Sequence, residues 1–340
     1  MTGELTRDPT APAAAGPAAS VAPAAPAAAT PVTSATSQAE AAHRADVLLE
    51  ALPYIQRFRG AVVVVKYGGN AMVDPQLGRA VADDVVLLRA VGLKPVVVHG
   101  GGPQISHLMA RLGKEAEFRD GLRVTDAETV DIARMVLVGK VNRDIVSSIN
   151  VHGPLAVGLS GEDAGLIAAD ARDPDLGFVG DVRAVNPTIL ERLLAEELIP
   201  VVSTIGSDPT GQAYNINADT VAGALAAALG AEKALFLTDV AGLLADVDDS
   251  GSLISHTTAD ELQAMIDDGH LTGGMIPKVS AALHAVRHGV GSAHLLDGRV
   301  PHVMLLELFS DAGVGTMITA GPAPAAIGTP AADVPTGGDR

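Results

Sequence analysis

A lysine followed by two glycines stands at the end of an apolar run in AVVVVKYGGNAM, residues 61–72. Lys66 would place a positive charge at the end of a buried strand, and Gly68 and Gly69 would leave the backbone beside that charge accessible. The N–H groups of such a loop can approach a phosphate or a carboxylate closely. A lysine at a strand end can also extend its ammonium group into solvent and bind nothing. The segment by itself leaves both interpretations open.

Two further glycine-rich segments follow apolar runs, namely HGGGPQ (99–104) and TDVAGLL (238–244). In an open parallel sheet the carboxyl ends of the strands lie along one edge, where ligands bind. Each loop alone could be no more than a tight turn between a strand and a helix. Three such loops in one sheet, one of them with a lysine, favour a site for an anionic ligand.

The common motifs of nucleotide-binding and hydrolytic sites are absent from the sequence. No GxGxxG, GxxxxGK[ST], HExxH or GxSxG pattern occurs, the ten histidines show no spacing typical of metal ligands, and there is no cysteine. These observations indicate a protein that handles phosphate with lysines but without a Walker loop.

The elements that must position these loops can be read from the apolar pattern. Short β-branched runs alternate with longer helical patterns, which predicts an α/β sandwich whose central sheet is parallel or mainly parallel. The expected strands are 61–67, 94–100, 155–160, 199–205, 233–239 and 299–305. The expected helices include 77–92, 218–230 and 258–269.

Composition narrows the class of protein further. The 340 residues include 40 acidic and 23 basic side chains, and the net charge of −17 argues against nucleic acid or an anionic membrane as a general partner. No run of about eighteen apolar residues occurs, so no membrane span is expected. The absence of cysteine fits a reducing compartment, and we expect a cytoplasmic protein.

The two ends of the chain differ from its middle. Residues 1–42 and 321–340 are rich in Ala, Pro, Thr, Ser and Gly, and we expect them to be disordered because they cannot bury enough apolar area. Residues 43–59 place leucines at helical spacing and predict an amphipathic helix, kinked or broken near Pro53.

Several motifs taken together resemble a known family. KYGGNAM, VVVHGGGPQI, GLRVTD, YNINADTVAGALAAALGA, LTDVAGLL and GGMIPKV stand in the order found in the amino acid kinase superfamily. The chain is most similar to its acetylglutamate kinase family, which uses ATP to phosphorylate the side-chain carboxylate of N-acetyl-L-glutamate in arginine biosynthesis. The resemblance implies a three-layer αβα sandwich over residues 60–320, with an acetylglutamate-binding lobe at about 60–215 and an ATP-binding lobe at about 216–320.

The resemblance also implies a catalytic set. Lys66 and Lys278 would lie on two sides of the transferring phosphoryl group, and Asp219 between them would fix their directions. Asp219 could instead, or in addition, cap the helix that begins near it. An acceptor carboxylate is already ionised at pH 7, so no general base is needed. Mg²⁺ would be carried on the phosphates of ATP.

Residues of the two substrate sites follow from the same motifs. For the acceptor, Arg123 suits a substrate carboxylate, glycines would offer backbone N–H groups and asparagines would offer amides. The implied acceptor residues are Gly101, Gly102, Arg123, Asn215 and Asn217. The implied nucleotide residues are Gly68, Gly69, Thr238, Asp239, Gly242 and Leu243.

The helix expected at 43–59 resembles a feature of the arginine-inhibited branch of the family. In that branch such a helix interlaces dimers into a homohexamer, a trimer of dimers, and L-arginine binds between this helix and the C-terminal lobe. The implied arginine contacts are Tyr54, His294, Glu307 and Gly313.

Two alternatives stay open. The chain could be a non-catalytic arginine-sensing kinase-like domain, although the presence of Lys66, Lys278 and Asp219 argues against it, or it could be another carboxylate kinase of the superfamily. One departure from the family pattern is Glu162 in GLSGEDAGLI, where many relatives carry lysine. We attach no functional meaning to it.

Overall fold

The computed structural model describes residues 35–119, 121–246, 249, 251–271, 273–310 and 313–322. The chain divides into two compact units, Met1–Asp46 and Val47–Arg340, and the second contains the fold described below. Most of the predicted disordered tails lies outside the described residues. Helix α1 (Ala35–Phe58) begins earlier than the predicted residue 43 and continues through Pro53. Alanine, glutamine and glutamate in its first turns favour a helix, which explains the earlier start.

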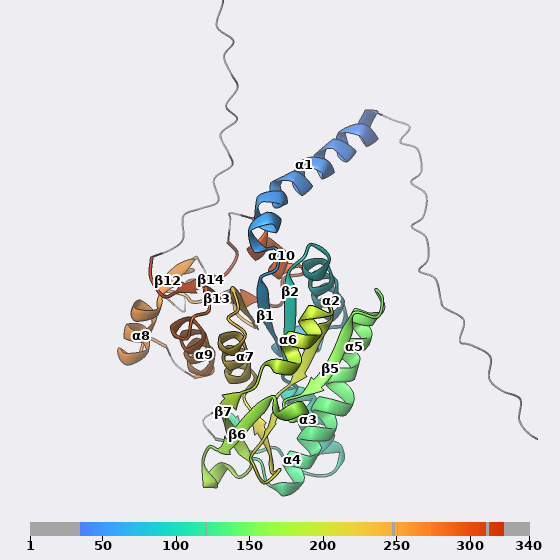
Figure 1. Ribbon diagram of the computed structural model, residues 1–340. Helices are drawn as coiled ribbons and strands as arrows, with labels where there is room; N and C mark the ends of the chain where they lie inside the picture. Colours follow the sequence, from blue (N-terminus) through green and yellow to red (C-terminus); the bar gives the residue numbers. More distant parts are fainter. Residues whose placement is uncertain are drawn as a thin grey trace, which may run out of the picture. The chain divides into compact units, whose positions relative to one another are not determined.

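The elements alternate along the chain, and Figure 1 shows them with the labels used here. The other helices are α2 (Pro75–Ala90), α3 (Gly102–Arg111), α4 (Ala127–Arg134), the π-helix η2 (Met135–Val141), α5 (Asn142–Asn150), α6 (Thr188–Ala195), α7 (Ala218–Ala228), α8 (Ala259–Asp267), α9 (Met275–Arg287) and α10 (Val303–Leu308). Short 3₁₀ turns are η1 (Gly69–Met72), η3 (Asp163–Gly165) and η4 (Pro174–Leu176). The strands are β1 (Val62–Tyr67), β2 (Lys94–His99), β3 (Phe118–Arg119), β4 (Leu122–Arg123), β5 (Ala156–Ser160), β6 (Ile167–Ala171), β7 (Val179–Val185), β8 (Ile199–Ser203), β9 (Ile205–Ser207), β10 (Ala213–Ile216), β11 (Lys233–Thr238), β12 (His256–Thr258), β13 (Ser292–Asp297) and β14 (Thr316–Thr319).

The main sheet confirms the predicted α/β class. Within the described residues it has eight strands in the order β12-β14-β13-β11-β1-β2-β8-β5. The pairs from β13 through β11, β1, β2 and β8 to β5 are parallel, whereas β14 runs antiparallel to β13. Strand β1 therefore lies inside the sheet, with β2 on one side and β11 on the other, and the three glycine-rich loops leave the same edge.

The valine run of β1 is buried because helices cover both faces of the sheet. Val64 packs in an apolar cluster with residues of α7 and α9. Val63 and Val65 point the opposite way and pack in a second cluster with residues of α2 and α5. Each of these valines is 0% exposed. A continuous apolar run is thus what a strand with two covered faces requires, and the three-layer prediction is confirmed.

Most of the predicted elements are present, but the strand predicted at 299–305 is wrong. The strand of this region is β13, Ser292–Asp297, and Val303–Leu308 forms helix α10. Pro301 has no N–H group to donate to a neighbouring strand, so an apolar run interrupted by it is a poor candidate for the sheet.

Two small β-structures were not predicted, and both carry candidate site residues. Strands β10, β7, β6 and β9 form a closed barrel, and β3 and β4 form a hairpin. Asn215 lies on β10 and Arg123 lies on β4. These strands are two to seven residues long, which is too short for a clear alternating pattern.

Helices α7 and α9 approach each other closely on one face of the sheet. A side chain at Gly223 of α7 would come within 2.7 Å of the carbonyl oxygen of Ala281 in α9, so only glycine fits there. This close packing matters for the site because α7 carries Asp219 and α9 carries Lys278.

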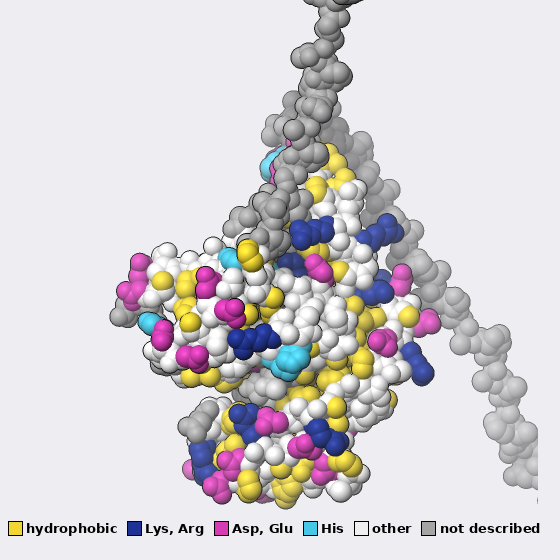
Figure 2. Space-filling model, turned by 60° about the vertical axis from the view of Figure 1, so that its left-hand side comes forward, with side chains coloured by type: hydrophobic (Ala, Val, Ile, Leu, Met, Phe, Trp, Pro, Cys, Tyr) yellow, Lys and Arg dark blue, Asp and Glu magenta, His cyan; other side chains and the backbone are white. Residues whose placement is uncertain are grey.

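The surface carries side chains of both charges. On the face that Figure 2 shows, lysine and arginine side chains are interspersed with aspartate and glutamate and form no continuous basic surface. Among the described residues, no helix is long and apolar enough to cross a membrane.

Candidate active site

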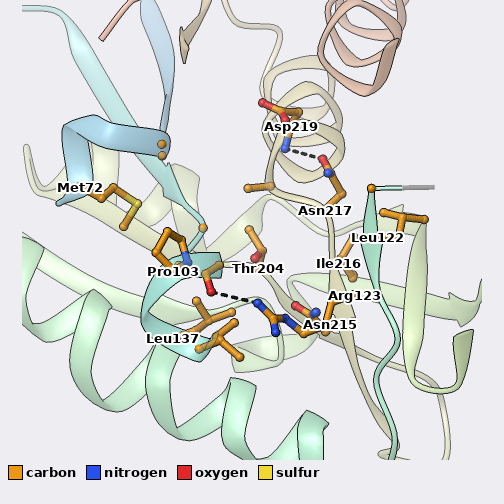
Figure 3. A pocket seen from close by; sticks show the side chains of 18 of the residues that line it. Met72, Pro103, Leu122, Arg123, Leu137, Thr204, Asn215, Ile216, Asn217 and Asp219 are labelled. Carbon is orange, nitrogen blue, oxygen red and sulfur yellow. Dashed lines mark hydrogen bonds between the residues drawn. The ribbon is translucent and has the colours of Figure 1, made fainter. Parts of the chain in front are cut away.

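A cavity of about 230 Å³ opens where β1 and β2 end. Figure 3 shows that its lining comes from the hairpin, the barrel, the glycine loops and the start of α7. The structure brings together nine of the residues implied by the family resemblance, because the following all line this cavity: Lys66, Gly68, Gly69, Gly101, Gly102, Arg123, Asn215, Asn217 and Asp219.

Asp219 contacts both candidate catalytic lysines. Its Oδ1 lies 3.0 Å from Nζ of Lys66 and its Oδ2 lies 3.7 Å from Nζ of Lys278. Lys66 and Asp219 are 7% and 4% exposed, so their charged groups are largely shielded from water. The side chain of Lys278 is 26% exposed. One buried carboxylate therefore holds two ammonium groups at the end of the cavity.

The alternative in which Asp219 caps helix α7 is wrong. The cap is Asn217, whose Oδ1 accepts hydrogen bonds from the N–H groups of Asp219 and Thr220 at 2.8 and 3.1 Å. Asn217 thereby places Asp219 in the first helical turn with its carboxylate turned to the lysines. The sequence motif NINAD is explained by this division of roles: the second asparagine begins the helix and the aspartate holds the cations.

The two glycines after Lys66 are required by the close approach of charged groups. A side chain at Gly68 would lie 2.9 Å from Nζ of Lys66. Gly69 has a φ of +66°, which favours glycine, and a side chain there would lie 2.5 Å from Oδ1 of Asp239. The glycines thus keep space open between the lysine at the end of β1 and the aspartate after β11.

Arg123 forms the other end of the cavity. Its guanidinium donates hydrogen bonds to the Gly102 carbonyl at 2.9 Å and to Oγ of Ser106 at 2.7 Å, and it lies over the ring of Phe118 at 4.7 Å. Arg123 is 6% exposed, and this burial lowers its pKa. Within the described part of the chain, no carboxylate lies within 4.0 Å of the guanidinium. A buried cation without an anion favours an anionic ligand beside it.

Ser106 is a site residue that the sequence did not reveal. It lies on α3, one helical turn after the glycine loop, and no motif marks a single serine at that position. Its hydroxyl accepts a hydrogen bond from Nη2 of Arg123 and so helps to orient the guanidinium.

Two of the residues expected at the nucleotide, Gly68 and Gly69, line the cavity, whereas the other four lie at the end of β11 or just after it and outside the lining: Thr238, Asp239, Gly242 and Leu243. Thr238 Oγ1 donates to the carbonyl of Val240 at 2.7 Å, and the N–H of Leu243 donates to Oγ1 of Thr316 at 2.8 Å. At Gly242 a side chain would lie 2.6 Å from that same Thr316 oxygen. This loop is therefore fastened to β14, and Asp239 connects it with Gly69 at the cavity edge.

The site suits a metal ion carried by a ligand better than one held by the protein. Among the described residues, no group of three or more histidine, aspartate or glutamate side chains could hold a metal ion. Asp219 is engaged by two lysines, and the carboxylate of Asp239 lies close to Gly69. A Mg²⁺ ion coordinated mainly by phosphate oxygens and water is compatible with this donor set.

Three of the four predicted arginine contacts belong to a second polar cluster. Nδ1 of His294 lies 2.6 Å from Oε1 of Glu307, whose Oε2 accepts from the N–H of Val314, next to Gly313, at 2.8 Å. Tyr54 of α1 is partly buried in the apolar cluster beneath. The sequence analysis missed Lys233, whose Nζ lies 3.1 Å from Nε2 of His294. Burial lowers the pKa of Lys233 to about 8.

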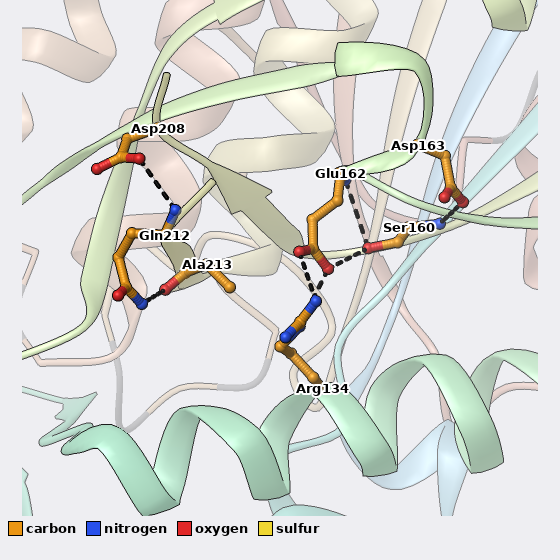
Figure 4. Close-up of polar contacts among 7 residues, drawn as sticks. All are labelled: Arg134, Ser160, Glu162, Asp163, Asp208, Gln212 and Ala213. Atoms are coloured by element: carbon orange, nitrogen blue, oxygen red, sulfur yellow. Dashed lines mark hydrogen bonds and ion pairs between the residues drawn. The ribbon is translucent and has the colours of Figure 1, made fainter. Parts of the chain in front are cut away.

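The unusual Glu162 has a defined partner, shown in Figure 4. Oε1 of Glu162 lies 2.9 Å from Nη2 of Arg134, near the end of α4, and Oε2 accepts from Oγ of Ser160 at 3.3 Å. Oδ2 of Asp163 accepts from the N–H of Ser160 at 2.7 Å. Glu162 therefore ties the end of β5 to α4 and does not contact the residues of the cavity.

The sequence of this chain matches a known family and several known proteins. The model of the Amino acid kinase family matches residues 61–297. The chain belongs to the amino acid kinase family. Acetylglutamate kinase of Saccharopolyspora erythraea is 57% identical over 285 residues, which cover 82% of this chain and 93% of that relative. Acetylglutamate kinase of Nostoc sp. is 55% identical over 282 residues, which cover 83% of this chain and 95% of the relative.

A solved structure resembles this member of the amino acid kinase family over a similar length. N-acetylglutamate synthase from Neisseria gonorrhoeae, in complex with coenzyme A and N-acetyl-glutamate, superposes with a TM-score of 0.72 at 25% identity. The match covers 82% of this chain and 64% of that one, so the synthase contains a further part that has no counterpart in the match.

The Glu162–Arg134 pair predicts the result of a charge-reversal cycle. Glu162→Lys should place two cations together and lower the free energy of unfolding by about 1 kcal/mol. Arg134→Glu should do the same, and the double variant should recover most of the loss because the pair is restored with opposite signs. Denaturant unfolding of the four proteins measures this. Additive losses in the double variant would show that the ion pair contributes nothing.

Proposed function

We propose that this protein is an acetylglutamate kinase, which transfers the γ-phosphoryl group of ATP to the side-chain carboxylate of N-acetyl-L-glutamate and yields N-acetyl-L-glutamyl 5-phosphate in arginine biosynthesis. The observation that carries the proposal is the cavity itself. Lys66 and Asp219 line one end of it, and Lys278 approaches the same aspartate from α9. At the other end lies Arg123, a buried arginine without a carboxylate partner among the described residues. The names of relatives that are 57% and 55% identical over most of their length support the same activity.

The chemistry of the transfer explains the lysines. Phosphoryl transfer between two anions depends on positioning and on neutralising the charge of the transferring group. Lys66 is fixed by a buried strand and by Asp219, so its charge need not reorganise during the reaction. Lys278 approaches the same aspartate from α9 and can contact the phosphoryl group from a second direction. Because the acceptor carboxylate is ionised at pH 7, no side chain has to remove a proton.

The acceptor has charged and polar partners along the cavity. Acetylglutamate carries two carboxylates, one that reacts and one that does not. The non-reacting carboxylate would pair with Arg123, because a planar guanidinium can bind a carboxylate through two hydrogen bonds. The N–H groups of Gly101 and Gly102 and the amides of Asn215 and Asn217 would hold the remaining polar atoms. In this arrangement the reacting carboxylate would lie toward Lys66.

ATP would bind across the loop after β11, with its phosphates reaching the glycines after β1. Thr238, Asp239, Gly242 and Leu243 would border the nucleotide, and Gly68 and Gly69 would offer N–H groups to phosphate oxygens. Mg²⁺, when bound with ATP, supplies further neutralisation of the phosphate charge. We place this reaction in the cytoplasm, which suits a chain without cysteine.

Regulation by L-arginine is part of the proposal. Glu307 is a buried carboxylate beside His294, and an arginine guanidinium is a natural partner for it. Helix α1 exposes several apolar side chains, with Leu48 and Leu49 at 71% and 63% exposure. A second copy of the chain would cover them, in accord with a homohexamer built as a trimer of dimers. A purely arginine-sensing role is less well supported, because Lys66 and Lys278 are both held by Asp219, as binding of a phosphoryl group would require.

The acceptor identity can be tested by coupled ADP release. We expect rapid turnover with N-acetyl-L-glutamate, and little with L-glutamate, L-aspartate or carbamate, because the site is built for an acceptor with a second carboxylate and an acetyl group. Faster turnover with carbamate or L-aspartate would assign the protein to another carboxylate kinase of the superfamily. No ADP release with any acceptor would favour the sensing role.

Substitution of either lysine should slow the transfer itself. Lys66→Ala and Lys278→Ala should each lower kcat by roughly 10²- to 10³-fold, the scale of one lost transition-state contact. Lys94→Ala is the matched control, because Lys94 is exposed at the opposite end of the neighbouring strand. Steady-state kinetics with a circular dichroism check of folding measures the effect. A kcat near that of the wild type would remove the substituted lysine from the catalytic set.

Arg123 should distinguish the two substrates. Arg123→Ala should weaken the binding of N-acetyl-L-glutamate by about 1.5–3 kcal/mol, which is the range for hydrogen bonds to a charged group. The KM for ATP should stay unchanged. Arg119→Ala is the control, because Arg119 lies on the same hairpin and its side chain is 49% exposed. If both KM values rise equally, Arg123 has a structural role or belongs to the nucleotide side.

Assembly and inhibition can be tested together. Deleting residues 1–59 should convert hexamers into active dimers and weaken arginine inhibition, since the effector must favour one arrangement of subunits over another. Glu307→Ala should weaken inhibition and leave the hexamer intact. Light scattering paired with arginine titration of activity gives both results. A dimeric full-length protein that is indifferent to millimolar arginine would contradict the regulatory part and leave the kinase activity untouched.

A further inference from the structure

A chain of hydrogen bonds runs beneath the glycine loop that follows β2. The guanidinium of Arg143 donates to Oδ1 of Asn142. Nδ2 of Asn142 lies 3.1 Å from Nε2 of His99 and 2.8 Å from the carbonyl oxygen of Val201. Nδ1 of His99 lies 2.9 Å from the carbonyl oxygen of Gly100. His99 and Asn142 are both 0% exposed.

The direction of each hydrogen bond follows from which groups can only donate or only accept. A guanidinium only donates, so the Asn142 atom beside Arg143 is its oxygen. The carbonyl of Val201 only accepts, which requires the NH₂ group of Asn142 on the other side. Nε2 of His99 then accepts from that NH₂ group, and the proton of the imidazole is on Nδ1, where it donates to Gly100. Burial lowers the pKa of His99 to about 4, and the charge of Arg143 acts in the same direction, so the ring is neutral.

The residues around this series of hydrogen bonds leave space for it and orient its side chains. Asn142 is the first residue after the π-helix η2, a wider turn that changes which side chains face the sheet. A side chain at Gly158 of β5 would collide with the guanidinium of Arg143, so only glycine leaves room for it. Leu137 of the same π-helix touches the loop from its other side, since a side chain at Gly101 would lie 2.6 Å from its Cδ2.

We propose that Arg143, Asn142 and His99 are positioning residues of the acceptor site, which act through Gly100 to hold the N–H groups of Gly101 and Gly102 toward the substrate. The proposal rests on the proposed kinase function. None of the three side chains lines the cavity. Their effect reaches the substrate only through the backbone of the loop, so it should appear in the binding of N-acetyl-L-glutamate and not of ATP.

A matched pair of asparagines on one helix tests the proposal. Asn142 and Asn150 stand at the two ends of α5, and the side chain of each forms hydrogen bonds with backbone groups. The partners of Asn150 are Leu155 and Ala156, which are far along the sequence from the glycine loop. Asn142→Leu should raise the KM for N-acetyl-L-glutamate roughly tenfold, which is the scale of one lost hydrogen bond. The KM for ATP should stay within about twofold of the wild-type value. Asn150→Leu should lower the melting temperature without changing either KM.

Three further variants keep the proposal testable if Asn142→Leu fails to fold. Arg143→Met removes an exposed side chain and should raise the acetylglutamate KM in the same sense, by a smaller factor. His99→Leu should match Asn142→Leu, and His99→Asn, which keeps a donor near Nδ1, should recover part of the loss. Unchanged KM values in the Asn142 and His99 variants, equal rises for both substrates, or the same selective rise in Asn150→Leu would overturn the proposal.

The tautomer of His99 provides a readout that does not depend on activity. In the full-length protein with ¹⁵N-labelled histidine, His99 should show a protonated Nδ1 and an unprotonated Nε2 from about pH 6 to 8, and Asn142→Leu should alter these shifts. A protonated Nε2 would refute the hydrogen-bond chain. If the wild-type protein shows the expected tautomer but does not turn over N-acetyl-L-glutamate, the proposed function is refuted. The role of the three residues at an acceptor site is then refuted with it, and their hydrogen bonds only shape the loop.

Discussion

The buried contact of Asp219 with two lysines is the interaction on which the rest of the site depends. Lys66 and Lys278 would repel each other if they met alone, and Lys66 is too buried for water to screen its charge. A single carboxylate at 3.0 and 3.7 Å compensates both. Loss of that carboxylate would leave an uncompensated buried charge, which is among the most destabilising changes in a protein interior.

The fold can be understood as the means of bringing these three groups together. Strand β1 brings Lys66 to the edge of the sheet, and its two-sided burial keeps that position rigid. Asn217 begins α7 so that Asp219 faces the lysine, and Gly223 lets α9 approach closely enough for Lys278 to reach the same carboxylate. These features belong to different elements of the fold, and all of them position the two ionic contacts of Asp219.

The cavity combines this cationic end with a second cation, Arg123, within a strongly acidic chain. Arginine buried without a carboxylate partner within the described residues is costly unless a ligand supplies the anion. The arrangement therefore favours an anionic ligand in the cavity. The supports of the cavity come from the long helical segment α4–η2–α5, which holds β5 through Arg134 and the glycine loop through Asn142.

The sequence by itself determined the α/β class, the position of the glycine loops and the residues at the carboxyl ends of the strands, because burial on two faces and the need for glycine beside a charge leave local patterns. It did not determine that Asn217 rather than Asp219 caps α7, that Arg123 lacks a carboxylate partner within the part of the chain that the structure describes, or that the last long strand is Ser292–Asp297. Those features, with Ser106 and the bonds among His99, Asn142 and Arg143, were decided by the tertiary structure. Each depends on atoms from elements far apart in the chain, and a hydrogen bond or an ion pair between such elements leaves no periodic trace in the sequence of either one.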